Sequence, residues 1–391
     1  MKKNKYKHIY YAWCLVFLIS ILDNTQPIIS NSLYGLLFLF GMINPTSKKV
    51  SLGFKVVTVI CIISLINSFF IKIPVGFVNE EPSPIKTLSI FVIAFAADRL
   101  YIPGKIQRLI ILNMIVPFFL IIIGGISVNE MGRFSNDLIN VNSRGVLYQM
   151  AFACSFYFLL AHEGNKYLNI IALFTSLVLI IKSGSRLDFI FIVLAIVFNF
   201  ALLKNSIVKK TFIQRIVIII IMVGGSAFIL KNMMEAQKHR FGSFSFETVF
   251  SDNNNELSKL ERVDYIMTGF EVSKYYPFGV GERNIVDAII TYGGTYVKDT
   301  YNVHSALAQS LFIAGWLGAL IWFIFVFKMS KLALRDFRKW YFMLVYILLC
   351  TFTQPLIFSK LFWIVVIFFE KEVLHIGNKQ YFEQKQTSLT D

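Results

Sequence analysis

The sequence predicts an all-α, polytopic integral membrane protein with about twelve transmembrane helices and one large extracytoplasmic loop subdomain. Three observations predict this fold class. Apolar residues make up 56% of the 391-residue chain and charged residues only 16%. Apolar segments of membrane length recur from one end of the chain to the other. The basic clusters occupy alternate connections between these segments, as the positive-inside rule requires.

The apolar segments give the order of the predicted helices. A bilayer core needs roughly 20 mostly apolar residues per helix. On that measure the predicted spans are Ile9–Leu22, Ile28–Ile43, Ser51–Ile71, Ile85–Ile102, Leu109–Ser127, Gly145–Ala161, Leu168–Ile181, Leu187–Leu203, Ile213–Leu230, Ser305–Phe327, Trp340–Thr353 and Phe358–Val373. No cleavage pattern follows the first span, so it is expected to be retained. The alternating basic connections predict a multi-pass protein whose N- and C-termini are both cytoplasmic.

One long polar interruption, Lys231 to Val303, separates two of these spans. We expect residues 231–304 to form an extracytoplasmic loop subdomain within a single membrane domain covering residues 1–391. Inside it, Ser251–Asn255 has the composition of a turn, and Glu261–Lys274 carries apolar residues at helical spacing. Tyr276–Gly281 then predicts a turn rich in backbone donors. A loop of this size suits an enzyme that works on a lipid-linked substrate at one membrane face.

Cations on the predicted external face oppose the topological trend, so each needs a reason. The candidate anion-binding cations among them are Arg133, Arg144, Arg186 and Arg262. A guanidinium group suits the oxygens of a diphosphate, because its planar fork binds two of them at once. The alternative is that each arginine meets lipid headgroups or pairs with a nearby carboxylate, namely Asp137, Asp188 or Glu261.

His304 is the best candidate for proton transfer, because an imidazole titrates near neutral pH. The alternative for His304 is a histidine at a helix start that bonds only to backbone. No metal site or cofactor is expected, since metal-ligand spacings, paired aspartates and phosphate-binding glycine loops do not occur in the sequence. The net charge of +15 follows the topology, so a nucleic-acid partner is not expected either.

Four stretches together resemble one family. They are Gly132-Arg133-Phe134 with Asn140–Gly145, then Ser183–Arg186, then Arg262 with Tyr276–Gly281, and finally His304 with Gln309, Gly315 and Gly318. In this order and spacing they are similar to the bacterial O-antigen ligase and polysaccharide polymerase superfamily, which contains Wzy-type polymerases and their ligase relatives. The likeness spans about residues 130–325. Val141, Leu187 and Ser305 depart from the family's pattern, and these departures favour a polymerase over a ligase.

The resemblance implies a GT-C-like glycosyltransferase that works without a metal or cofactor and inverts the anomeric centre. Its substrate would be an undecaprenyl-diphosphate-linked oligosaccharide, used at the outer face of the bacterial cytoplasmic (inner) membrane to build capsule, exopolysaccharide or O-antigen. By motif, Arg186 and Arg262 would hold the donor diphosphate, and His304 would act as base on the acceptor hydroxyl or orient it. Further binding residues for the diphosphate or glycan would be Arg133, Arg144, Asn142, Gly279 and Gly281. A flippase and a chain-length regulator of the same pathway would be partners.

Two alternatives remain at this stage. A ligase would transfer finished glycan to another acceptor, and only that acceptor would differ. A flippase or other transporter of lipid-linked oligosaccharide would explain the helix count and the external cations. Charges inside the predicted spans are scarce, with Lys55 and Asp98 near span ends, which counts against a translocation path. A transporter also leaves Lys231–Val303 unexplained.

Overall fold

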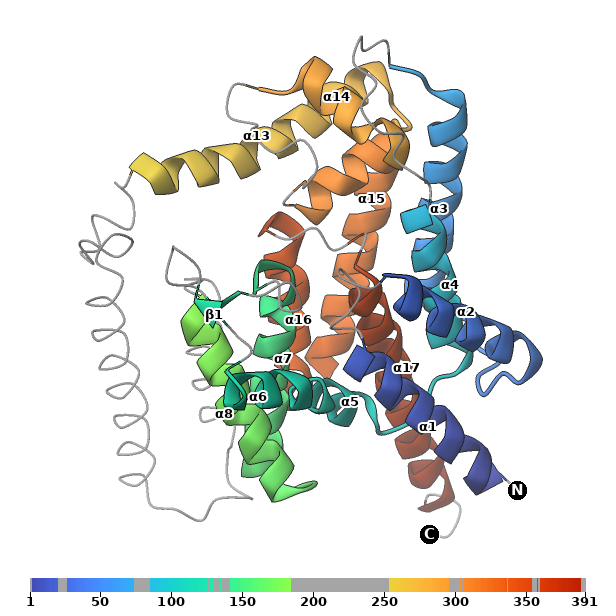
Figure 1. The fold of residues 1–391 in the computed structure, drawn as a ribbon. Helices are drawn as coiled ribbons and strands as arrows, with labels where there is room; N and C mark the ends of the chain where they lie inside the picture. The colour runs from blue at the N-terminus through green and yellow to red at the C-terminus, as the bar shows by residue number, and fades with distance from the viewer. Residues whose placement is uncertain are drawn as a thin grey trace.

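The computed structural model describes residues 2–19, 27–73, 85–124, 127–128, 134–135, 141–183, 253–294, 303, 305–335, 337–353, 357 and 359–387. Over these ranges the protein is a bundle of helices, which confirms the all-α prediction. Most of each predicted span that falls within them is helical. The spans Leu187–Leu203 and Ile213–Leu230 lie outside the described residues. In Figure 1, the start of α1 and the end of α17 lie at one end of the molecule, while α13 and α14 lie at the opposite end.

The first four helices are α1 (Lys2–Ile19), α2 (Pro27–Ile43), α3 (Leu52–Phe70) and α4 (Ile85–Arg99). The last three follow their predicted spans closely, whereas α1 begins at Lys2, well before the predicted start at Ile9. The start of α3 shows why the boundary lies where it does. Ser51 has extended backbone angles, and its side chain accepts the N–H of Phe54 at 3.2 Å. This is an N-cap, which satisfies one of the donors that the first helical turn leaves free.

The predicted span Leu109–Ser127 is not one helix in the structure. It is divided into α5 (Ile106–Leu112) and α6 (Ile115–Ile122) by Asn113 and Met114. Pro117 supplies the physical reason, because proline has no N–H to donate to the carbonyl four residues earlier, and that carbonyl belongs to Asn113. The break was therefore readable from the position of the proline.

Two short strands were not predicted. β1 (Ser127–Val128) pairs antiparallel with β2 (Phe134–Ser135). After them, α7 (Val141–Leu160) and α8 (Lys166–Ser183) pack side by side as a helical hairpin. Gly164 in the connecting turn has a positive φ of 74°, which a glycine adopts without strain.

The remaining elements are α13 (Asn253–Tyr275), the 3₁₀ turn η2 (Glu282–Asn284), α14 (Ile285–Tyr292), α15 (Ala306–Arg335), α16 (Phe337–Thr353) and α17 (Lys360–Thr387). The predicted loop helix Glu261–Lys274 lies within α13. The turn predicted at Ser251–Asn255 is wrong for its last three residues, because α13 already begins at Asn253. Asparagine is common at helix starts as well as in turns, so composition did not separate the two.

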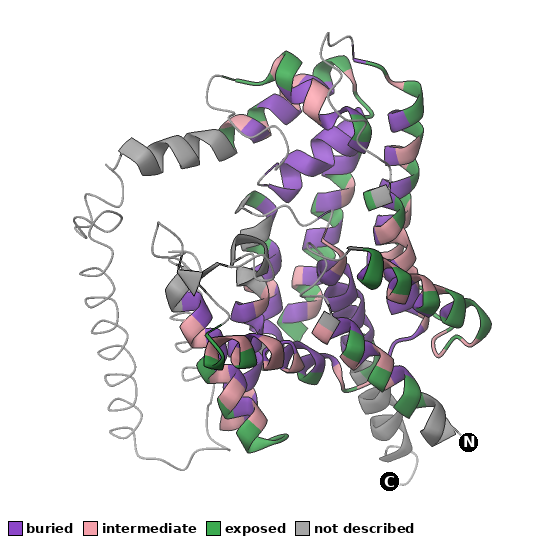
Figure 2. Cartoon of the chain, in the orientation of Figure 1, coloured by how far each residue is buried: buried purple, intermediate pink, exposed green. Residues whose placement is uncertain are grey.

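Two of the described helices are long and apolar enough to cross a membrane by length and composition, Leu52–Phe70 and Ala306–Arg335. The described residues also include shorter apolar helices, among them Ile28–Ile43 and Lys166–Ile180. Figure 2 shows that buried residues dominate α15 and α17, while exposed ones follow the outer faces of α1, α2 and α3. Phe70 is 83% exposed and Phe69 is 64% exposed. Large apolar side chains on an outer helix face suit contact with lipid.

The core is aromatic where α15 meets α17. Trp322 and Phe325 of α15 pack against Phe362 and Trp363 of α17, with Phe325 and Trp363 ring centroids 5.5 Å apart. All four side chains are at most 1% exposed. The two long C-terminal helices therefore share a closely packed apolar interface.

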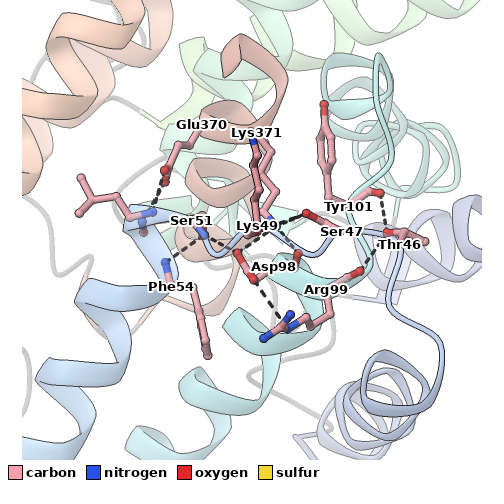
Figure 3. A network of polar contacts seen from close by, with 12 residues as sticks. Thr46, Ser47, Lys49, Ser51, Phe54, Asp98, Arg99, Tyr101, Glu370 and Lys371 are labelled. Carbon is pink, nitrogen blue, oxygen red and sulfur yellow. Dashed lines mark hydrogen bonds and ion pairs between the residues drawn. The ribbon is translucent and has the colours of Figure 1, made fainter. Parts of the chain in front are cut away.

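A buried ionic cluster lies where α17 meets α4 and the segment before α3 (Figure 3). Lys371 Nζ lies 3.0 Å from Asp98 Oδ1, and neither side chain is more than 7% exposed. Lys371 also donates to Ser47 Oγ at 2.8 Å and to the carbonyl of Lys49 at 2.9 Å. Asp98 Oδ1 accepts the N–H of Ser51 at 2.8 Å. These extra bonds offset the cost of removing both charges from water.

The two carboxylates beside Lys371 hold backbone groups of other elements. Glu370 accepts the N–H groups of Leu52 at 2.6 Å and Gly53 at 2.9 Å, in the first turn of α3. Glu372 accepts the Tyr101 hydroxyl at 2.5 Å and the N–H of Gly104 at 2.6 Å. These three charges lie within the last four residues of the predicted span Phe358–Val373, so they occur near a span end, as Lys55 and Asp98 do. The apolar average of the span gave no sign that they compensate one another or bind backbone.

Candidate functional site

The turn after α13 contains the glycines of the predicted loop motif. Its chain reverses at Tyr276–Gly281, where the N–H of Gly279 donates to the carbonyl of Tyr276 at 2.8 Å. Gly279 and Gly281 have φ values of 80° and 78°. These lie in the left-handed region that other residues rarely adopt. Glycine is therefore required at both positions by the backbone itself.

This turn docks onto a break in α15. Ala314 (φ −135°) and Gly315 (φ 58°) depart from helical geometry and interrupt the helix. The carbonyls of Phe312 and Ile313 accept the N–H groups of Val280 at 2.7 Å and Gly281 at 3.3 Å. In return, the N–H of Trp316 donates to the carbonyl of Pro277 at 3.0 Å. The turn thus supplies hydrogen bonds to backbone groups that the break leaves without helical partners. Such bonds are needed in a membrane, where no water is present to bind free backbone groups.

The approach of the two backbones leaves no room for side chains. A Cβ on Gly279 would lie 2.5 Å from the backbone nitrogen of Ala314, and one on Gly315 would lie 2.5 Å from the backbone carbon of Pro277. Both distances are shorter than any real contact between such atoms. Gly279 on the turn and Gly315 on α15 therefore both allow the backbone of the turn to lie directly against the backbone of the break.

A polar face of α3 forms the other side of this docking site. We define it by Ser64, Asn67 and Ser68, which are at most 7% exposed and share one helix face at spacings of three and four residues. Ser64 Oγ accepts the N–H of Glu282 at 3.1 Å, and Ser68 Oγ accepts the N–H of Arg283 at 3.2 Å. The start of η2 is thereby fixed to α3.

Two amide side chains complete the contact. Asn67 Nδ2 donates to the carbonyl of Phe278 at 2.5 Å and to the carbonyl of Ile313 at 3.2 Å. Asn284 Nδ2 donates to the carbonyls of Val280 at 2.8 Å and Ile71 at 2.9 Å. Asn67 therefore joins α3 to the loop turn and to the break in α15. Asn284 joins the turn to Ile71, the residue that follows α3.

Glu282 connects the same turn to α4. Its carboxylate accepts the N–H of Thr87 at 2.9 Å and also the hydroxyl of Thr87. Thr87 lies in the first turn of α4, where backbone N–H groups lack helical partners. Burial raises the pKa of Glu282, and the two hydrogen bonds from Thr87 and the charge of Lys86 act in the opposite direction.

The first turns of α15 are also held firmly. Ser305 Oγ accepts the N–H of Ala308 at 3.2 Å, so it caps the helix, and it donates to the carbonyl of Thr351 at 3.1 Å. Gln309 Oε1 accepts the N–H of Ile357 at 3.1 Å. The loop helix α13 packs along the same helix, where the rings of Phe270 and Trp316 are 5.3 Å apart.

Residues 171–323, from α8 to the middle of α15, match the protein-family model described as O-antigen ligase. The chain carries a domain of the O-antigen ligase family. The match confirms the resemblance to the O-antigen ligase and polymerase superfamily. Together with the apolar helices, it identifies a membrane protein. No curated protein matches the chain in sequence.

Arg186, Arg262 and His304 belong to the O-antigen ligase domain, but the structure does not describe how their side chains lie. Arg186 and His304 lie outside the described residues, as does Arg133, which precedes the domain. Arg262 lies in α13, and Asn142 and Arg144 lie in the first turns of α7, but their side chains are not among those described. The convergence of Arg186, Arg262 and His304 therefore stays a prediction.

Gly279 and Gly281 are the two candidates that the structure describes fully. Their N–H groups are bonded to the carbonyls of Tyr276 and Ile313 within the protein. The observed role of both glycines is to bring the turn onto α3 and α15. A direct contact between these glycines and the glycan or diphosphate stays a prediction.

The polar face of α3 was not predicted. A signal for it existed, because three polar residues at spacings of three and four lie close together in the second half of the mostly apolar span Ser51–Ile71. Nothing in the sequence, however, indicated which segment they would meet. Their partners, Phe278 to Asn284, are more than 200 residues further along the chain, as the separations of 211 to 218 residues show.

Proposed function

We propose that this membrane protein is a glycosyltransferase that polymerises undecaprenyl-diphosphate-linked oligosaccharide repeat units of a capsule, exopolysaccharide or O-antigen. The observation that carries the proposal is the O-antigen ligase domain at residues 171–323. That domain includes all three residues assigned to the chemistry, Arg186, Arg262 and His304.

The proposed reaction inverts the anomeric carbon of the donor. An acceptor hydroxyl oxygen attacks that carbon and forms the new glycosidic bond, while the bond to the diphosphate breaks and undecaprenyl diphosphate leaves with the electron pair. His304 takes the proton of the acceptor hydroxyl. Arg186 and Arg262 neutralise the charge that develops on the leaving diphosphate, with Arg133, Arg144 and Asn142 as further binding residues.

The reaction is placed at the outer face of the bacterial cytoplasmic membrane. The shared end of α1 and α17, opposite α13 and α14 in Figure 1, supports cytoplasmic termini and an extracytoplasmic loop subdomain. A flippase would supply the lipid-linked repeat units to this face, and a chain-length regulator would act on the growing chain. The diphosphate bond of the substrate stores the energy, so we propose that no metal ion is needed.

A direct test uses purified protein and a synthetic undecaprenyl-diphosphate repeat unit in the presence of a chelator. We expect a ladder of products on a gel. Arg186→Ala, Arg262→Ala and His304→Ala should each lower the rate by about 10²-fold or more, with normal amounts of protein in the membrane.

Arg335→Ala is the matched control, because Arg335 is an exposed cation at the other end of α15. It should leave the ladder unchanged. Normal chain lengths in the three site variants would contradict the assignment of these residues. No ladder from the wild type would contradict the polymerase proposal itself.

A ligase is the second candidate, because the matching family carries that description. The two functions differ only in the acceptor. Offering a lipid-linked repeat unit and a lipid A core acceptor in separate reactions distinguishes them. A ladder with the first acceptor indicates a polymerase, whereas a single transfer that needs the second indicates a ligase.

A further inference from the structure

We propose that Asn67 of α3 is a positioning residue for the glycosyl transfer, although α3 lies far outside the O-antigen ligase domain at residues 171–323. The predicted effect of Asn67 on the rate of glycosyl transfer rests on the proposed function. The predicted effect of Asn67 on the docking of the 276–284 turn depends only on the contacts of that turn.

Among the described residues, Asn67 is the one side chain whose observed hydrogen bonds reach both the loop turn and the break in α15. The two hydrogens of its Nδ2 serve the carbonyl of Phe278 in the turn and the carbonyl of Ile313 at the break. Both acceptors are main-chain oxygens, so the contact fixes backbone against backbone. The amide is 7% exposed, so water does not easily replace these bonds.

The position of Asn67 in an apolar helix also supports the proposal. Burying an amide in a membrane helix is costly unless its hydrogen bonds are made. Ser64 and Ser68, on the same face, receive the N–H groups of Glu282 and Arg283. The three side chains of the polar face of α3 therefore all bind backbone groups of the 276–284 turn, at Phe278, Glu282 and Arg283.

Displacing the turn would disturb two elements that carry candidate residues. Pro277 bonds to Trp316 just after the break, so the turn sets the direction of α15 from Ala306 to Ala314. The turn also follows directly on α13, which carries Arg262. Asn67 touches neither Arg262 nor the reacting groups by any observed contact. It would act through the relative placement of α13 and the first part of α15.

The test compares three substitutions of similar size. Asn67→Leu removes both donors, and Asn67→Asp places acceptor oxygens opposite two carbonyls. Asn67→Gln keeps the amide on a longer chain. With wild-type protein that forms a ladder, we expect Asn67→Leu and Asn67→Asp to lower kcat by about tenfold to hundredfold per folded molecule, with KM for the lipid-linked substrate nearly unchanged. Asn67→Gln should recover part of kcat.

Asn113→Leu is the matched control. Asn113 is also buried in an apolar region, at 2% exposed, but its Nδ2 has no hydrogen-bond partner in the described part of the chain. It should leave kcat unchanged. A purely structural role for Asn67 would lower the yield of folded protein and leave kcat per folded molecule at the wild-type value, which would overturn the proposal.

A second measurement does not depend on enzymatic activity. Val280 is 0% exposed and bonds to Phe312 in the docked turn. In Val280→Cys, a membrane-impermeant maleimide should label this position slowly, as located by peptide mass spectrometry. Adding Asn67→Leu should speed the labelling at least about tenfold, as expected when about 1.4 kcal/mol of docking is lost.

Unchanged labelling would overturn the inference whatever the activity shows, and faster labelling with normal kcat would overturn the positioning role. If the wild type makes no ladder while Asn67→Leu speeds labelling, the proposed function fails and the positioning role fails with it. Only the contact between Asn67 and the docked turn would then remain supported.

Discussion

Two buried polar networks join distant parts of this chain, and they use different chemistry. Around Asp98 and Lys371, charged groups compensate each other within 3.0 Å and bind nearby backbone. Around the 276–284 turn, Asn67, Asn284 and two serines bind backbone groups, and Glu282 is the one carboxylate among the contacts of the described residues. The first network pairs its buried charges with one another and with nearby backbone, so it can be explained by stability alone.

The second network places largely neutral groups beside the end of α13, the helix that carries Arg262, and beside the break in α15. Neutral hydrogen bonds can hold a backbone in place without pairing with an arginine. Under the proposed function, a carboxylate at the position of Asn67 would compete for an arginine that is needed for the diphosphate. The first network therefore joins helices through charge, whereas the second fixes the turn between α13 and α15 through neutral groups.

The largest effect is expected from Lys371→Met. The substitution removes the nearer cation of the buried Asp98, leaves Arg99 at 4.0 Å as its remaining ionic partner, and removes the bonds to Ser47 and Lys49. We expect a loss of roughly 3–5 kcal/mol in the free energy of unfolding, because breaking one partner of a buried pair strands the other charge. Thermal unfolding in detergent and the yield of monodisperse protein measure this.

Lys331→Met is the control, since Lys331 is an exposed cation on α15. It should change stability little. A Lys371→Met protein as stable as the wild type would show that the ionic network is not the main connection between α17, α4 and the segment before α3.

A smaller effect is expected from Gly279→Ala. The new Cβ would meet the backbone of Ala314 at 2.5 Å, at a φ of 80°. We expect a loss of about 1–3 kcal/mol in stability together with loss of polymerisation. Melting temperature and product ladder are both measured.

Gly35→Ala is the matched control for this substitution, because a Cβ on Gly35 of α2 would have nothing within 4 Å. It should be neutral or slightly stabilising. Loss of activity in Gly279→Ala at full thermal stability would instead favour a direct role of Gly279 in binding.

The smallest effect concerns pH and Glu282. Burial raises the pKa of this carboxyl in the folded protein. The folded state therefore binds the proton more tightly than the unfolded state does. The resulting stabilisation is complete below the unfolded pKa and is lost as the pH rises through the folded pKa.

Accordingly, lowering the pH from neutral to mildly acidic should stabilise the wild type relative to Glu282→Gln. The difference between the two melting temperatures, measured across that range, tests this. Glu163→Gln, which changes an exposed carboxyl, serves as the control. A difference that stays constant or changes in the opposite direction would show that the hydrogen bonds from Thr87 outweigh the burial of Glu282.

Much of the fold was predictable because membrane helices are marked by local composition. Spans such as Ser51–Ile71 and Ile28–Ile43 match α3 and α2 within a residue or two. The failures have local causes as well. Pro117 breaks a span that hydropathy alone treats as continuous, and Asn253 starts a helix where its composition indicated a turn.

The candidate site was predictable only in part. The glycines at 279, 281 and 315 could be selected from their pattern, but the pattern did not show that they meet each other. The charges at Glu370 to Glu372 were hidden in an apolar average, and their partners lie in the segment before α3, in its first turn, and at the end of α4. Contacts between segments so far apart in sequence leave no mark in local composition.

The sequence by itself determined the class of protein: an apolar, helical membrane protein with one long polar loop and motifs of the O-antigen ligase family. Hydrophobicity and glycine content act locally, so they can be read from a single chain. Only the tertiary structure decided that the loop turn rests on a broken α15 and on the polar face of α3. Hydrogen bonds form wherever donors and acceptors are brought together, and that meeting is set by the packing of the whole bundle.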